Sequence, residues 1–108
     1  MINFQRLQEM ALAFPETEEL PHFEKTSFRV KNKIFATFDP KKNQATVKLS
    51  ESDQDIFSLS DKDIIFPVPN KWGKQGWTII KLNEINDELF SEILKSAYFE
   101  VIPKRRTK

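Results

Sequence analysis

The sequence predicts an α+β domain in which a mostly antiparallel β-sheet carries two long helices on one face, in the order α-β-β-β-α-β-β-α. Apolar residues recur at helical spacing near both ends of the chain. Between those ends lie short runs rich in Phe, Ile, Val and Thr, separated by turn residues, which is typical of strands. The length of 108 residues is typical of one domain, so we expect residues 1–108 to form a single domain.

The first half of the chain predicts a helix followed by three strands. The helix is expected to start at Asn3, a residue type that caps helices, and to stop at Pro15. After an acidic loop over residues 16–21, strands are expected at residues 23–30, 33–39 and 44–49. The breaks at Lys31–Asn32 and at residues 40–43 contain residues typical of hairpin turns. Because a meander reverses at each turn, these two turns are expected at opposite ends of the sheet.

The second half predicts a short helix, two strands and a long helix. Ser50 is expected to cap a helix over residues 51–59, and Asn86 is expected to start the last helix. Strands are expected at residues 64–68 and 77–82. The last helix has a wide apolar face made by Leu89, Phe90, Ile93, Leu94, Ala97 and Tyr98. We expect the first four of these to pack on sheet residues Ile34, Phe38, Val47, Leu49 and Ile79.

The composition excludes several classes of protein. With no Cys, the chain has no disulfide, thiolate metal site or Cys nucleophile. No segment has the pattern of a leader peptide or a membrane span, so we expect a cytoplasmic protein with no membrane partner. The net charge of +1 argues against a nucleic-acid binder that depends on bulk charge. The charge is unevenly distributed, however, since the charged residues of segment 25–48 are mostly basic and those of segment 51–63 are mostly acidic.

Catalytic groups are scarce in this sequence. His22 is the only histidine, no Gly-rich loop precedes a helix, and no Ser lies in a nucleophile-elbow setting. We therefore expect no enzyme activity, no cofactor and no small-molecule substrate, and we interpret His22 as structural or exposed. Carboxylates cluster at residues 16–19 and 53–55, but such clusters are more often solvating charges than cation ligands. We expect no metal site, and a cation held by Glu16, Glu18 and Glu19 is the least supported alternative.

Residues 66–78 form the most distinctive segment, because they hold both tryptophans and both glycines of the chain. Lys71 and Lys74 flank Trp72, and this combination of a stacking ring with positive charge suits a polyanion or a protein surface. Trp72 has two interpretations that the sequence leaves open: the ring contacts a partner, or it folds back over the loop. Trp77 lies in an alternating strand, and we expect it in the core.

In their order and spacing, several segments resemble the MmcQ/YjbR family of small bacterial proteins. They are Pro-His-Phe-Glu-Lys at 21–25, Ser-Phe-Arg-Val at 27–30, Lys-Ile-Phe-Ala-Thr at 33–37, Val-Lys-Leu at 47–49, the tryptophan segment at 66–78, and Pro103-Lys104-Arg105. The resemblance covers nearly the whole chain. It implies a compact α+β fold similar to the frataxin-like (CyaY-like) arrangement and a DNA-binding role of the double-wing type. Glu24 departs from the family pattern, in which Gly is common, and places a negative charge beside Lys25.

The resemblance and the basic loops together predict a DNA-binding accessory protein, with weak and largely sequence-independent binding through β-hairpin loops. The residues expected to contact DNA are Lys31, Lys33, Lys41, Lys42, Lys71, Trp72 and Lys74. Since the hairpin turns lie at opposite ends of the sheet, only the loops at one end can form one continuous site. The alternative is a non-enzymatic protein-interaction or adaptor module, which fits the near-zero net charge better.

Overall fold

The structure is a computed structural model that describes residues 2–102. Within this range the elements are α1 (Phe4–Leu12), β1 (Thr17–His22), β2 (Lys25–Val30), β3 (Lys33–Asp39), β4 (Gln44–Lys48), α2 (Glu51–Ser60), β5 (Ile65–Pro67), α3 (Lys71–Lys74), β6 (Trp77–Lys81) and α4 (Asp87–Val101). The family-like segment Pro103-Lys104-Arg105 lies outside the described residues.

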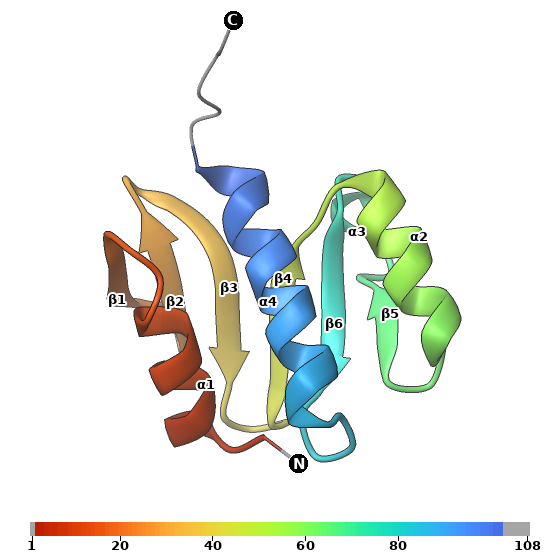
Figure 1. Ribbon diagram of the computed structural model, residues 1–108, viewed down its shortest axis with the longest axis horizontal. Coiled ribbons are helices and arrows are strands. Elements are labelled where there is room, and N and C mark those ends of the chain that lie inside the picture. Colours follow the sequence, from red (N-terminus) through yellow and green to blue (C-terminus); the bar gives the residue numbers. More distant parts are fainter. Residues whose placement is uncertain (1, 103–108) are drawn as a thin grey trace, which may run out of the picture.

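The strands form one antiparallel sheet in the order β1-β2-β3-β4-β6-β5. Figure 1 shows α1, α4 and α2 side by side over one face of this sheet, with α4 crossing β3 and β4. The opposite face carries none of these three helices. The predicted α+β class, with an antiparallel sheet and the long helices on one face, is confirmed. None of the described helices combines the length and the apolar character needed to cross a membrane.

The core lies between the sheet and the helices. On α4, Phe90, Ile93 and Leu94 are fully buried and Leu89 packs against them, as predicted from the apolar face of this helix. Full burial of each such side chain contributes about 1.5–3 kcal/mol to the free energy of unfolding. At the rim, the Tyr98 hydroxyl donates a hydrogen bond to the carbonyl oxygen of Pro15 at 2.9 Å, which ties the end of α1 to α4.

The helices begin at the predicted caps. The side-chain oxygens of Asn3, Ser50 and Asn86 each accept a hydrogen bond from the backbone N–H three residues later, at 2.8, 3.1 and 2.8 Å. Each bond satisfies a backbone donor that has no partner within the first turn of its helix. Local sequence chemistry therefore sets the start of α1, α2 and α4.

Two elements differ from the sequence prediction. Residues 17–22 form β1, although residues 16–21 were predicted to be a loop. This segment pairs along its whole length with β2, from Thr17 opposite Val30 to His22 opposite Lys25. Residues 71–74 form the single-turn helix α3, in which the Asn70 side chain accepts the N–H of Trp72 at 2.8 Å. Neither element has a periodic apolar pattern long enough to be recognised in the sequence.

The predicted core was wrong at two isoleucines. Phe38, Val47 and Leu49 are buried as expected, whereas Ile34 and Ile79 are only half-buried and lie on the open face of the sheet. In β6 the alternation buries Thr78 and Ile80 instead of Ile79. In β3 a β-bulge reverses the face of Ile34: Ala36 pairs with Phe28 and Ile34 with Arg29, so Phe35 is the extra residue.

Candidate functional site

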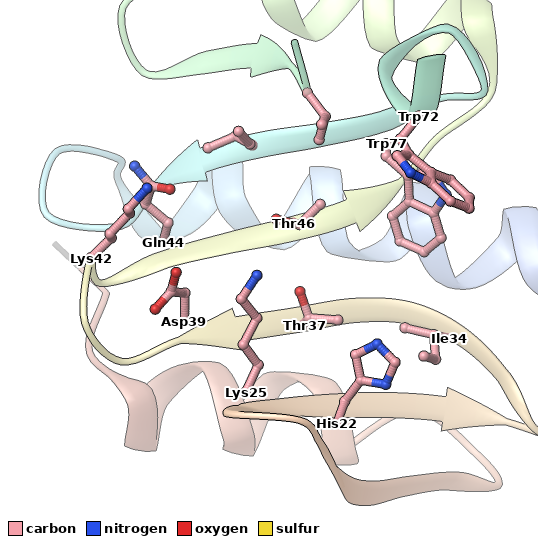
Figure 2. A pocket seen from close by; sticks show the side chains of 12 residues that line it. His22, Lys25, Ile34, Thr37, Asp39, Lys42, Gln44, Thr46, Trp72 and Trp77 are labelled. Atoms are coloured by element: carbon pink, nitrogen blue, oxygen red, sulfur yellow. The ribbon is translucent and has the colours of Figure 1, made fainter. Parts of the chain in front are cut away.

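A groove on the open face of the sheet is the candidate functional site. It has a volume of about 550 Å³, within the range of ligand-binding clefts. Figure 2 shows Trp72 and Trp77 together at one end of the groove and Asp39, Lys42 and Gln44 at the other. The groove therefore runs along the strands, from the α3 segment to the β3–β4 turn.

The register of the strands determines the floor of the groove. Thr37 of β3 pairs with Thr46 of β4, and Thr46 pairs with Ile79 of β6, so the three side chains form a row across the sheet. Because alternate residues of a strand point to opposite faces, the next residue of each strand is buried in the core. The floor thus offers two hydroxyl groups beside an apolar side chain.

Two indole rings border one end of the groove. Trp72 of α3 is 49% exposed, and Trp77 at the start of β6 is half-buried. Both rings line the groove, so the expectation that Trp77 lies in the core was wrong. About half of the Trp72 surface is in contact with protein, and the other half is exposed. Rings in this position can stack on planar groups of a ligand.

A buried amide holds the tryptophan segment in place. Gln54 of α2 is 7% exposed, and its Nε2 donates hydrogen bonds to the carbonyl oxygen of Gly73 at 2.9 Å and to Oγ1 of Thr78 at 3.1 Å. The Thr78 hydroxyl in turn donates to the carbonyl oxygen of Gly76 at 3.0 Å. These bonds connect α2, α3 and β6 behind the two indole rings.

The two glycines of this segment are required by close backbone contacts. A Cβ atom at Gly73 would lie 2.0 Å from the carbonyl oxygen of Val68, well inside van der Waals contact. A Cβ atom at Gly76 would lie 1.9 Å from the carbonyl oxygen of Leu49, and Gly76 has a φ of +105°, which L side chains rarely adopt. The backbone beside Trp72 and Trp77 therefore cannot accommodate a side chain at either glycine.

The positive charge of the groove comes from Lys25 and Lys42, which form no ion pair within residues 2–102. Lys41, next to Lys42, instead contacts the carboxylate of Glu24 at 3.2 Å. Asp39 adds a negative charge at the same end of the groove. Two cations and one anion give this end of the groove a small positive excess.

Two other residues of the basic segment have structural contacts. Nε of Arg29 donates a hydrogen bond to Oγ of Ser27 at 2.9 Å, and this serine donates to the carbonyl oxygen of Leu20 at 2.9 Å. The ammonium group of Lys48 lies 3.8 Å from the carboxylate of Glu100 on α4. The basic character of residues 25–48 is therefore only partly available to a ligand.

The predicted DNA-binding residues are divided between the two ends of the sheet. Lys31 and Lys33 flank the β2–β3 turn, at the same end as α3 with Lys71, Trp72 and Lys74 (Figure 1). The β3–β4 turn, with Lys41 and Lys42, lies at the opposite end. Of the seven residues, the groove brings together Trp72 and Lys42.

Sequence reasoning missed His22, Lys25, Thr37 and Thr46 as groove residues. Polar residues that alternate with Phe, Ala and Val in two neighbouring strands do indicate a sheet with one polar face. That signal was present in the sequence. An alternating pattern does not indicate a groove, because one end of the groove is formed by Trp72, and the position of Trp72 depends on the tertiary fold.

His22 lines the groove beside the tip of the β1–β2 hairpin. Its ring lies edge-on to the ring of Phe23, with the centroids 4.9 Å apart. Within the part of the chain that the structure describes, no group of three His, Asp or Glu side chains is placed to hold a metal ion.

Comparison with known proteins places this architecture in a family. A family model described as YjbR matches residues 12–100. The crystal structure of the Deinococcus radiodurans protein DR2400, which has a DUF419 domain, is similar over 100% of this chain and 84% of that chain, with a TM-score of 0.84 and 22% sequence identity. None of the curated proteins with which the chain was compared matches it.

Proposed function

The chain belongs to the YjbR family, and from this premise and the geometry of the groove we propose that it binds DNA as a single strand on the open face of its sheet. In this proposal the tryptophan end of the groove holds bases and the lysine end holds phosphates. The interaction is non-covalent and involves no catalysis.

The layout of the groove carries the proposal. Trp72 and Trp77 lie at one end, and Lys25 and Lys42 line the remainder. Stacking of a base on an aromatic side chain contributes about 1–3 kcal/mol, and lysines attract the phosphates between bases. The five residues of β4 span roughly 13 Å at the rise of a strand. A few nucleotides of an extended strand fit this length.

The distribution of basic loops favours a single strand over a duplex. Lys31 and Lys33 are separated from Lys41 and Lys42 by the length of the sheet, so these lysines form no continuous surface for a duplex backbone. An open sheet face with aromatic rings and hydroxyl groups is instead typical of modules that bind unpaired bases.

Binding is expected to be weak and nearly independent of base sequence. The net charge is +1, and Asp39 offsets part of the charge of the lysines in the groove. Every base has a face that can stack on an indole ring, so stacking discriminates little between bases. If Lys25 and Lys42 each contact one phosphate, log K should fall against log salt concentration with a slope of about −1.4.

Fluorescence anisotropy with a labelled single strand at several salt concentrations tests the proposal. Replacing both groove lysines, Lys25→Ala with Lys42→Ala, should remove most of the slope. Trp72→Ala should weaken binding by about 1–3 kcal/mol. The matched control is Lys62→Ala with Lys95→Ala, which removes the same charge from sites outside the groove. Absence of binding at low salt, or an equal loss of slope in both double variants, contradicts the proposal.

A second candidate function, contact with a protein partner, is favoured by the outer side of α2. Ile56 and Leu59 are 61% and 71% exposed and lie three residues apart, so they are neighbours on the helix surface. Asp55 lies beside them, and exposed apolar side chains rimmed by charge are typical of interaction sites.

The double variant Ile56→Ser with Leu59→Ser separates the two candidates. If DNA binding is the function, this variant should bind a single strand as the wild type does. If the adaptor function holds, the wild type should bind no strand, and this variant should lose a protein that the wild type retains in affinity capture.

A further inference from the structure

We propose that Phe23, at the tip of the β1–β2 hairpin, is a second base-stacking position that extends the single-strand site beyond the lysine end of the groove. The inference rests on the proposed function. It adds a defined path for the strand, from the tryptophans along the groove to the hairpin tip.

Phe23 contributes little to the folded core, because its side chain is 94% exposed. Trp72, the exposed ring at the other end of the groove, is 49% exposed. A single exposed apolar residue is common on protein surfaces and is not by itself informative. The backbone of Phe23 makes this residue different.

The backbone at Phe23 adopts a conformation that disfavours a bulky side chain. His22 pairs with Lys25, so Phe23 and Glu24 form a two-residue hairpin loop. The φ of Phe23 is +60°, while Glu24 is not among the described residues with positive φ. A two-residue loop with positive φ at its first position is a type II′ turn, in which glycine is preferred there.

Phe23 is therefore an unfavourable choice for folding that gains no burial in return. Left-handed backbone is a true outlier for a bulky residue. Strain of this kind, at a residue that the core does not need, is found where the side chain serves binding. Glycine at this position would fold at least as well and would lack the ring.

The position of the ring connects it to the groove. The His22 ring lines the groove and lies edge-on to the Phe23 ring, with the centroids 4.9 Å apart. On the other side of the tip, Glu24 contacts Lys41 of the β3–β4 turn at 3.2 Å, so the two hairpin tips lie side by side. Through His22 and the Glu24–Lys41 contact, the ring thus stands next to the end of the groove that holds Lys25 and Lys42.

These neighbours favour a base over other partners of an exposed aromatic ring. The lysines of the groove attract an anionic chain, and the nearby Glu24 is paired with Lys41, which reduces its repulsion of phosphate. A strand whose phosphates lie at Lys25 and Lys42 brings its next base to the hairpin tip. A face of Phe23 is open there for stacking.

The test compares Phe23→Gly with Phe23→Trp on labelled oligothymidines of roughly 4 and 16 nucleotides, which bracket the usual site sizes of small sheet modules. For the longer strand, Phe23→Gly should weaken binding by roughly 5- to 150-fold, and Phe23→Trp should retain it. For the shorter strand the loss should be smaller, because that strand can occupy the tryptophan end alone. The melting temperature of Phe23→Gly should equal or exceed that of the wild type.

Glu16→Gly is the matched control for the backbone change. Glu16 is exposed, has a φ of +61° and does not line the groove. This variant should equal or exceed the wild type in melting temperature and should bind both strands with wild-type affinity.

Three outcomes overturn the inference while leaving the proposed function intact. In the first, Phe23→Gly keeps wild-type affinity for the longer strand while Trp72→Ala weakens binding. In the second, Phe23→Gly loses the same fold of affinity for both strand lengths. In the third, the melting temperature of Phe23→Gly falls clearly, which would show that the ring has a structural role. If Phe23→Gly instead loses binding to anionic phospholipid vesicles and keeps strand binding, the tip is a membrane contact and the inference fails. If the wild type binds no strand, the proposed function and the inference fail together.

Discussion

Gln54 illustrates how one buried side chain can hold in place a surface segment that is distant from it in the sequence. Its amide bonds to the carbonyl oxygen of Gly73 and to the Thr78 hydroxyl, and these bonds hold α3 against α2. The sequence offers no sign of this, because Gln54 looks like one more polar residue of an acidic helix. Its partners lie 19 and 24 residues away along the chain.

We expect Gln54→Met to lower the free energy of unfolding by about 1–3 kcal/mol, because the buried carbonyl of Gly73 would lose its side-chain donor. Urea denaturation followed by tryptophan fluorescence measures this change. Gln75→Met is the matched control, since Gln75 is exposed at the end of α3 and its replacement should change stability by less than about 0.5 kcal/mol. Equal stability of the two variants would show that the Gln54 bonds contribute nothing.

At the scale of elements, two neighbouring side chains of β6 lie on opposite faces of the sheet. Ile80 is fully buried under the helices, whereas Ile79 is half-buried in the groove. The β-bulge in β3 places Ile34 on the groove face, although a simple alternation of side chains would place it in the core. Alternation could be recognised in the sequence. Which set of alternate residues faces the helices depends on the partner strands.

We expect Ile80→Ala to lower the free energy of unfolding by about 2–5 kcal/mol, since it opens a cavity in the core. Ile79→Ala should cost about 1 kcal/mol, because this side chain is partly solvated already. Urea denaturation of both variants measures the difference, and each serves as the control for the other. A cost for Ile79→Ala as large as that for Ile80→Ala would contradict the assignment of faces.

At the scale of the whole molecule, the structure shows which of the predicted binding residues lie together, a question that the sequence left open. The tryptophan segment lies at the same end of the sheet as the β2–β3 turn, and the lysines of the β3–β4 turn lie at the opposite end of the sheet. The open face of the sheet, not either set of turns, connects Trp72 with Lys42. The candidate site is therefore a groove on one face of the sheet, with tryptophans at one end and Lys42 at the other, where the sequence predicted a set of loops.

We expect no transition metal to bind this protein with stoichiometric, micromolar or tighter affinity. Zinc sites use three or four protein ligands, and within residues 2–102 no three His, Asp or Glu side chains are arranged to supply them. Isothermal titration calorimetry with Zn²⁺ on the wild type and on His22→Ala measures this. Tight binding that is lost in His22→Ala, or in Glu16→Gln with Glu18→Gln, would refute the prediction.

By itself, the sequence determined the α+β class, the starts of the three longer helices and the two-residue turn at Lys31–Asn32, where both residues have positive φ. Caps, turn residues and apolar periodicity act over a few neighbouring positions, so they can be recognised without a fold. The tertiary structure alone decided that residues 17–22 pair as a strand, that Ile34 and Ile79 face the groove, and that Trp72 and Lys42 border one site. These features depend on contacts between residues far apart in the chain, and such contacts exist only once the sheet has formed.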